Sequence, residues 1–237
     1  MIPFFRKIRK KMADDNRPFR YMRYAVGEIV LVVIGILIAL QINNWNEFKQ
    51  DRVIEQNYLE AIRNDLEKDI VQAEYIIEMC LIPLNIINNI DPKFDLNTQL
   101  QVKNIDTSDL AFVDLFRRKA SFRSINGTYS SLISDGKSNL IKNKVLFQQI
   151  QSIYDTQQVR IFSIYDDFKT RENDLTSDFS YEKYHLNYNL LKNNKNLKLI
   201  AALANFWDPA QYYCLFLNSL IVEMKKVIIE INDELLK

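Results

Sequence analysis

Hydrophobic positions follow two different patterns along the chain. From Ala25 to Ile42 the residues are almost continuously apolar, and Glu28 and Gln41 are the only strongly polar ones among them. At about 1.5 Å rise per residue this run forms roughly 27 Å of helix, close to the hydrocarbon thickness of a bilayer. Beyond Trp45 apolar residues recur every three or four positions, which is typical of helices that bury one face. The pattern predicts an all-α protein, with a single N-terminal transmembrane helix followed by an antiparallel helical bundle.

The second pattern predicts three long amphipathic helices. The first follows the span and ends near residue 90, with a kink or a local break at Pro83. Asn143 is expected to cap the second helix, which runs over residues 144–173. Asp208 and Pro209 predict the N-cap and first turn of the last helix.

Shorter elements connect these helices. A short helix should end at a left-handed Gly136, and another should begin at a cap formed by Thr107 or Ser108. Residues 91–106 and 174–196 are polar and are expected to be loops. Four glycines and five prolines in 237 residues are too few for the turns of an all-β domain. The predicted organisation is a basic tail (1–23), a transmembrane helix (24–44) and a helical domain outside the cytoplasm (45–237).

Charge predicts the orientation of the span. The tail carries eight Lys or Arg residues and two Asp, whereas only Lys49 and Arg52 are basic in the twenty residues after Ile42. This asymmetry favours a cytoplasmic N-terminus. The implied partner of the tail is a bilayer with an anionic inner leaflet rather than nucleic acid.

Aromatic residues flank the apolar run. Tyr21 and Tyr24 precede it and Trp45 follows it, where membrane-interface anchors are expected. A cleaved signal peptide is the main alternative, but Ala39 would need a small residue at Gln41 for a cleavage site. The sequence therefore predicts a retained, single-pass signal anchor. A buried helix of a soluble core would not explain the basic flank.

Four residues of the run share one side of the helix. At about 100° per residue Gly35, Ala39 and Asn46 fall within roughly 20° of the direction of Glu28. Gly35 and Ala39 form a small-x-x-x-small pair, which allows close approach of a second helix. One hypothesis is a transmembrane helix interface, with a second copy or with another membrane protein. The alternative is that Glu28 only extends its carboxylate to the membrane surface.

Residues with chemical potential are sparse. His185 is the only histidine, and Glu182 three positions earlier would supply only half of a di-metal motif. The aromatic residues around positions 181–188 and 206–213 could line a pocket, but such residues more often form core. We expect no catalytic, cofactor-binding or metal-binding residues, and hence no enzyme.

Cys80 and Cys214 each lie on the apolar stripe of a long helix. Outside the cytoplasm they could form a disulfide. Spacing alone cannot establish contact, and two buried free thiols are the simpler interpretation.

Two blocks of sequence resemble a known family. The block "GEIVLVVIGILIALQINNWNE" after the basic "FFRKIRKK", and the later block "TYSSLISDGKSNLIKNKVLFQQIQSIYD", are similar to an uncharacterised bacterial family of single-span membrane proteins. The resemblance implies a bacterial inner membrane, with most of the chain periplasmic and mainly helical. It implies no activity.

The sequence therefore leaves function open between classes. The favoured hypothesis is a membrane-anchored interaction or scaffolding module. The alternative is a ligand-sensing bundle that signals through its span to a separate partner, and an enzyme is the least favoured class.

Overall fold

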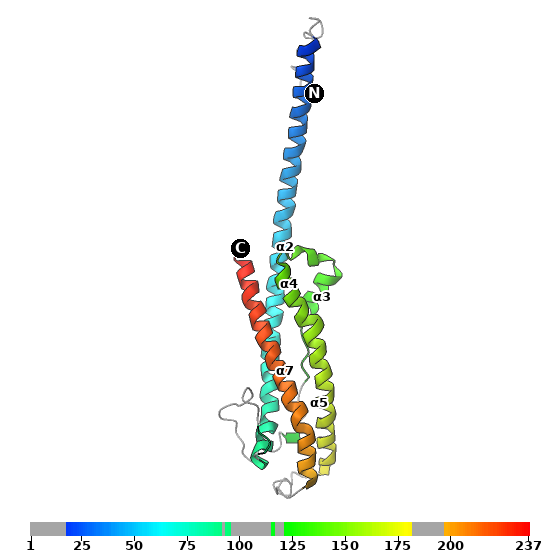
Figure 1. Ribbon diagram of the computed structural model, residues 1–237, viewed down its shortest axis with the longest axis vertical. Helices are drawn as coiled ribbons and strands as arrows, with labels where there is room; N and C mark the ends of the chain where they lie inside the picture. Colours follow the sequence, from blue (N-terminus) through cyan, green and yellow to red (C-terminus); the bar gives the residue numbers. More distant parts are fainter. Residues whose placement is uncertain (1–17, 92, 96–114, 117–120, 182–196) are drawn as a thin grey trace. The chain divides into compact units, whose positions relative to one another are not determined.

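The computed structural model describes residues 18–91, 93–95, 115–116, 121–181 and 197–237, with only the backbone at residues 18–21, 89 and 90. Every regular element among these residues is a helix, which confirms the all-α class (Figure 1). The chain divides into two compact units, residues 1–54 and residues 55–237. Each unit is described by itself below.

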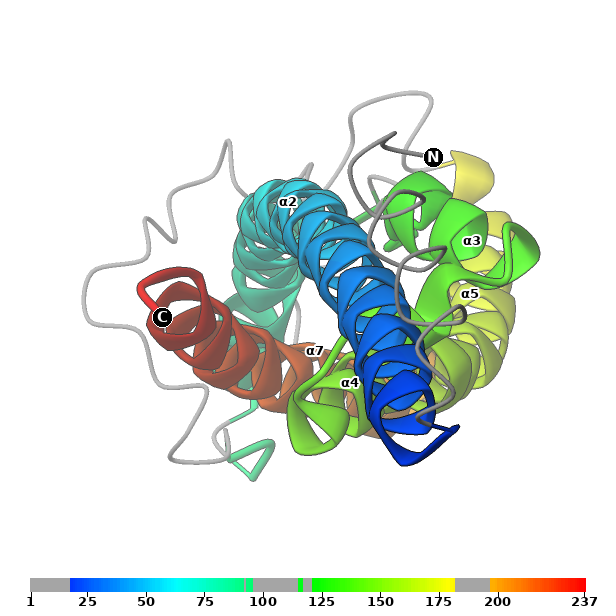
Figure 2. The ribbon, with the colours of Figure 1, turned by 90° about the horizontal axis from the view of Figure 1, so that it is seen from above.

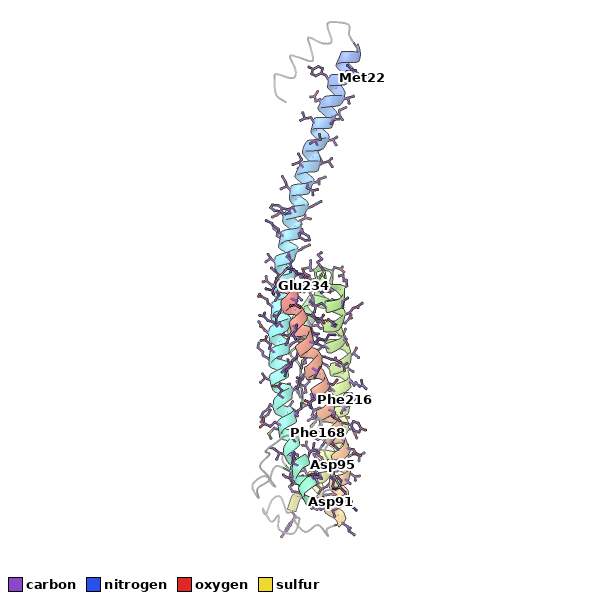
Figure 3. The ribbon with its side chains drawn as sticks, turned by 60° about the vertical axis from the view of Figure 1, so that its left-hand side comes forward. Met22, Asp91, Asp95, Phe168, Phe216 and Glu234 are labelled. Atoms are coloured by element: carbon purple, nitrogen blue, oxygen red, sulfur yellow. The ribbon has the colours of Figure 1, made fainter. Side chains whose placement is uncertain are left out.

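The first unit consists of the beginning of α2, a helix that spans Pro18–Ile90. Among the described residues, α2 is the one helix that is long and apolar enough to cross a membrane, and none of its most apolar window is buried. Side chains project outward all round this part of the helix (Figure 3). An apolar surface that is exposed on every side is favourable in lipid and costly in water.

The second unit contains three long helical segments. The later part of α2 is the first, and α7 (Leu197–Leu235) is the last. Between them lies one uninterrupted helical run, made of α4 (Lys144–Gln151), a π-helical segment η4 (Ser152–Gln157) and α5 (Gln158–Asp178). Two short elements precede that run, α3 (Gly127–Ser134) and η3 (Lys137–Leu140). Seen end-on, α5 and α7 are neighbouring helices (Figure 2).

Polar contacts give the direction of packing. Arg63 of α2 donates a hydrogen bond to Asn232 of α7 at 3.2 Å, and Lys225 pairs with Glu74 at 2.9 Å. The residue numbers rise on α2 as they fall on α7, so these helices are antiparallel. Helix α7 is likewise antiparallel to the α4–α5 run, because Gln149 bonds Glu230 and Gln157 bonds Glu223. One helix thus packs antiparallel to two others.

Local signals in the sequence are confirmed at three helix ends. The side chain of Asn143 accepts a hydrogen bond from the Leu146 amide at 3.1 Å, as an N-cap should. Gly136 has φ of 67°, a left-handed conformation that favours glycine. Helix α2 ends at Ile90, near the predicted position, and it continues through Pro83 without a break.

The predicted start of the last helix is wrong. Helix α7 begins at Leu197, so Pro209 lies inside it rather than in its first turn. A proline inside a helix costs about 3 kcal/mol. Before that proline, α7 buries four apolar side chains: Leu199, Leu203, Phe206 and Trp207. Burial of such side chains contributes roughly 1.5–3 kcal/mol each, which offsets the cost of the proline.

The middle helix also differs from its prediction. It continues to Asp178, past the expected end near residue 173, because Leu175 is buried and extends the apolar face. The π-helical segment inside it was not predicted. The predicted helix from Thr107 or Ser108 and most of the loop at 91–106 lie outside the described residues, as do residues 182–196 of the second loop.

Candidate functional site: buried carboxylates around an extended segment

An extended segment, Ser121–Asn126, lies among the helices of the second unit. It has no regular secondary structure, yet Phe122 is buried in the core. Backbone N–H groups in such a place must find partners, because an unpaired buried amide costs about as much as a lost hydrogen bond. The partners are side chains of the neighbouring helices.

Asp69 of α2 accepts hydrogen bonds from one backbone amide and one hydroxyl group of this segment. Its Oδ1 accepts from the Ile125 amide at 2.9 Å, and its Oδ2 accepts from the Ser124 hydroxyl at 2.5 Å. Gln158 of α5 donates in turn to the Ser124 hydroxyl oxygen. One turn earlier on α2, Asp65 accepts from the Thr128 hydroxyl at 2.5 Å. The two aspartates therefore attach the segment and the start of α3 to α2.

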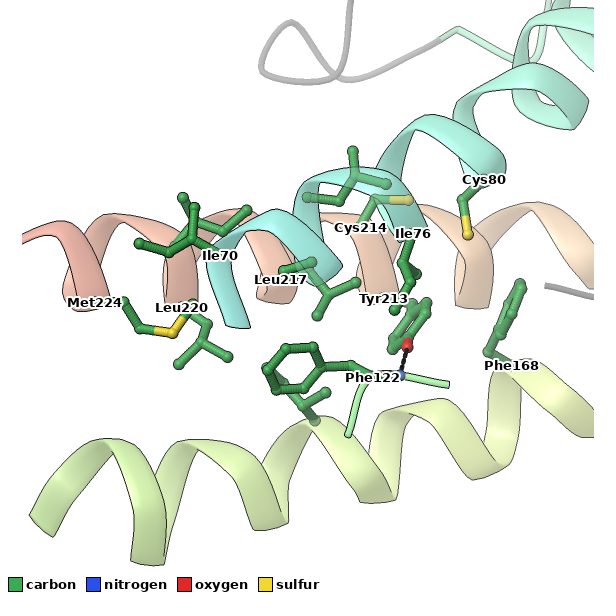
Figure 4. Packing of buried hydrophobic residues seen from close by; sticks show 14 of the residues in the cluster. Ile70, Ile76, Cys80, Phe122, Phe168, Tyr213, Cys214, Leu217, Leu220 and Met224 are labelled. Atoms are coloured by element: carbon green, nitrogen blue, oxygen red, sulfur yellow. Dashed lines mark hydrogen bonds between the residues drawn. The ribbon is translucent and has the colours of Figure 1, made fainter. Parts of the chain in front are cut away.

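Two further side chains complete the attachment. The Phe122 amide donates to the hydroxyl of Tyr213 on α7 at 2.9 Å, and the Arg123 amide donates to Gln72 on α2 at 2.8 Å. Figure 4 shows the Phe122–Tyr213 bond, with Phe168 of α5 nearby. The ring of Phe168 stacks on that of Tyr213, with centroids 5.2 Å apart. The segment is thus bonded to all three long helical segments.

Burial dominates the electrostatics of Asp69. Its side chain is almost fully buried, and desolvation raises the pKa of its carboxyl above the ordinary value of 3.8. The hydrogen bonds from Ser124 and Ile125 lower this pKa, and the nearby charge of Asp65 raises it. The folded chain therefore binds a proton at Asp69 more readily than an unfolded chain does.

Tyr154 lies beside these carboxylates on the π-helical segment. Burial raises the pKa of its phenol, and the charges of Asp69 and Asp65 raise it further. Its ring stacks on Tyr129 of α3, with centroids 4.7 Å apart. The Tyr154 hydroxyl is buried and has no hydrogen-bond partner among the described residues, whereas the Tyr129 hydroxyl donates to Asp155 at 2.8 Å. π-Helical turns inside α-helices are frequent at functional sites, which makes this region the strongest candidate.

A second set of buried carboxylates lies at the end of the second unit where its part of α2 begins. Glu55 of α2 accepts from the Lys142 amide at 2.6 Å. Glu234 of α7 accepts from the Asn143 amide group at 3.1 Å and from the Lys237 ammonium at 2.8 Å. Glu234 is therefore a buried residue of α7 rather than part of its solvated face. In both sets, buried carboxylates accept hydrogen bonds from residues that lie outside the α-helices.

The hydrogen bonds of these carboxylates indicate a structural role. Both oxygens of Asp69 and one of Asp65 already accept protein hydrogen bonds. Within the described residues no three His, Cys, Asp or Glu side chains are grouped so that they could hold a metal ion. Glu182 and His185, which would supply only half of a di-metal motif, lie outside the described residues.

The residues proposed from sequence as a helix interface and as membrane-interface anchors lie in the first unit, not among the buried carboxylates. Glu28, Gly35, Ala39 and Asn46 all lie on α2 in the first unit. A side chain built at Gly35 would meet no atom within 4 Å, so that surface of the helix is open. Of the membrane-interface anchors, Tyr24 and Trp45 are exposed, and the Tyr21 side chain is not among those described. The Lys49 ammonium lies 3.8 Å from the centre of the Trp45 ring.

The described aromatic residues that were considered as a pocket lining fall in two places. Phe206, Trp207 and Tyr213 are buried in the core, whereas Tyr181 and Tyr212 are exposed. Tyr184 and Tyr188 lie outside the described residues.

The sequence interpretation missed Asp65, Asp69 and Tyr154. One signal was available, because both aspartates directly precede residues of the buried stripe, Leu66 and Ile70. Carboxylates at the border of a buried face need partners when they are desolvated.

The described structure thus defines a class: an all-α chain with one helix able to span a membrane and a helical unit whose buried carboxylates hold non-helical backbone. The chain belongs to the family of unknown function DUF6090, whose model matches residues 28–207. This match confirms the resemblance to an uncharacterised family that the sequence blocks indicated. Neither a curated protein nor a solved structure matches the chain.

Proposed function

We propose that this chain is a single-pass, membrane-anchored interaction module of a bacterial inner membrane. In this proposal the N-terminus is cytoplasmic and the helical unit is periplasmic. The observation that carries the proposal is the apolar part of α2, whose side chains are exposed on every side. The excess of Lys and Arg before the span supports the orientation.

The partner in this proposal is another membrane span, from a second copy or from a different protein. Support comes from the shared side of Glu28, Gly35, Ala39 and Asn46, and from the open surface at Gly35. Small residues allow two helix backbones to approach closely, and van der Waals packing drives association in lipid. No nucleic acid, cofactor or reaction is part of the proposal, because the carboxylates of the buried cluster already bond the protein backbone and hydroxyl groups.

Crosslinking of the full chain in native membranes, followed by mass spectrometry, tests whether a membrane partner exists. A membrane two-hybrid assay of residues 18–54 then tests the interface. Gly35→Ile should weaken association several-fold, whereas Val33→Ile on the opposite side should leave it unchanged. If both variants associate as strongly as the wild-type segment does, this stripe is not the interface.

Topology is tested separately. A reporter that is active only outside the cytoplasm, fused after Lys237, should be active. Activity only from a cytoplasmic reporter at that position would reverse the proposed orientation.

A further inference from the structure

Cys80 and Cys214 meet in the core of the second unit. Cys80 lies on α2 and Cys214 on α7, and both side chains have no exposed surface. Both are free thiols, and Cys80 lies close enough to Cys214 to raise the pKa of its thiol. In Figure 4 the Cys80 side chain projects from α2 toward α7, the helix that carries Cys214. The structure therefore supplies the contact that sequence spacing could not establish.

We propose that Cys80 and Cys214 form a disulfide bond that joins α2 to α7 in the mature protein. The inference rests on the proposed periplasmic location, because disulfides persist in oxidising compartments. Two S–H bonds break and one S–S bond forms. The two electrons and two protons pass to a disulfide-bonded oxidant, which is left as a dithiol.

The position of the pair determines when this reaction occurs. The neighbouring Cys80 and burial both favour the neutral Cys214 thiol and raise its pKa, whereas the thiolate is the form that attacks a disulfide. An oxidant also cannot reach a thiol that has no exposed surface. The bond therefore forms while the chain is still folding, before α7 packs against α2. Once formed it is protected from reductants for the same reason.

The proposed disulfide also crosslinks α7 to α2 across a long loop. The cysteines are 134 positions apart, so the bond closes a long loop that contains α3, α4 and α5. A crosslink across a loop of this length restricts the unfolded chain strongly. Reduction should therefore lower the denaturant concentration at which the second unit unfolds.

The test uses the full chain in membranes of the cells that make it. Proteins are precipitated with acid, denatured in detergent and alkylated with a maleimide without reductant, and the intact mass of the chain is measured. The expected result is no adduct without reductant and two adducts after reduction. Cys80→Ser and Cys214→Ser should each show one adduct without reductant.

Two adducts on the unreduced wild-type chain would overturn the proposal. The topology reporter after Lys237 then locates the error. If the reporter is active outside the cytoplasm, the location is correct and the pairing is wrong. If it is active only in the cytoplasm, the proposed location fails together with the disulfide.

Discussion

The two parts of α2 use apolar residues in opposite ways. Between residues 25 and 42 apolar side chains occupy nearly every position and are exposed, as at Leu37, which is 58% exposed. Between residues 55 and 90 they recur every three or four positions and are buried, as at Leu66, which has no exposed surface. One helix can carry both patterns only if its surroundings change along its length. The exposed apolar surface of the first part fits lipid, and the periodic pattern of the second buries one helix face in a core.

Charged residues differ between the two parts in the same sense. The apolar run contains one acidic residue, Glu28, on the side that carries Gly35 and Ala39. The second part buries Glu55, Asp65 and Asp69, each of which accepts hydrogen bonds from backbone or hydroxyl groups of other segments. A carboxylate is thus tolerated inside the second unit because protein donors replace water.

The largest expected effect is the loss of membrane insertion when charged residues are placed in the first part of α2. Replacing Ile34 and Leu37 together by Arg should abolish stable insertion, since an Arg at the centre of a span costs roughly 3 kcal/mol. Carbonate extraction of membranes measures the inserted fraction. Val71→Arg and Tyr75→Arg, on the exposed surface of the second part, should leave insertion unchanged. Retention of the Ile34/Leu37 variant would show that this helix is not a membrane span.

The next largest expected effect is the loss of stability caused by a core substitution in the second unit. Phe168 is fully buried and packs against Phe206 and Tyr213, with ring centroids 5.6 and 5.2 Å away. Phe168→Ala should lower the free energy of unfolding by about 3–5 kcal/mol, measured by urea denaturation in detergent. Phe162 lies on the same helix but is 70% exposed, so Phe162→Ala should change it by less than about 0.5 kcal/mol. Equal losses would contradict the placement of the core.

Periodicity explains why most of the fold was predictable. The apolar stripes on α2 and α7 follow from 3.6 residues per turn, and the cap at Asn143 and the left-handed Gly136 follow from local chemistry. These signals lie within a few residues of the structure that they specify. They need no knowledge of the rest of the chain.

The candidate site was not predictable in the same way. Asp69 is 55 residues from Ser124, and Phe122 is 91 residues from Tyr213, so no local pattern relates the partners. The π-helical segment adds one residue to a turn but leaves the apolar spacing around Ile153 and Ile161 compatible with an α-helix. The start of the last helix was predicted wrongly at Asp208 and Pro209. The burial of Phe206 and Trp207 stabilises the helix before Pro209 and outweighs the local preference of proline for a first turn.

Two buried tyrosines test the attachment of the extended segment. Tyr213→Phe removes the acceptor of the Phe122 amide and should cost about 1–3 kcal/mol of unfolding free energy. Tyr154→Phe removes a buried hydroxyl without a described partner, so stability should stay constant or rise. Denaturant unfolding of both variants measures the difference. A comparable loss in Tyr154→Phe would mean that a bound group satisfies this hydroxyl, and would favour the ligand-sensing alternative.

The smallest expected effect is the pH dependence that Asp69 imposes. Burial raises the pKa of its carboxyl above 3.8, so the folded chain holds this proton at pH values where the unfolded chain has lost it. The contribution of Asp69 to stability is therefore fully present below pH 3.8 and declines as the pH rises through the folded-state pKa. Asn at this position keeps one oxygen to accept from the Ile125 amide but cannot titrate.

Comparison of Asp69→Asn with the wild type isolates this contribution, because the other titrating groups are common to both chains. The unfolding free energy of the variant minus that of the wild type should increase from about pH 4 upward and then level off. Asp155→Asn is a suitable control, since Asp155 is exposed and bonds only the Tyr129 hydroxyl among the described contacts. A difference for Asp69→Asn that is constant across the range would mean that the two donors to this carboxylate, the Ser124 hydroxyl and the Ile125 amide, fully compensate its burial.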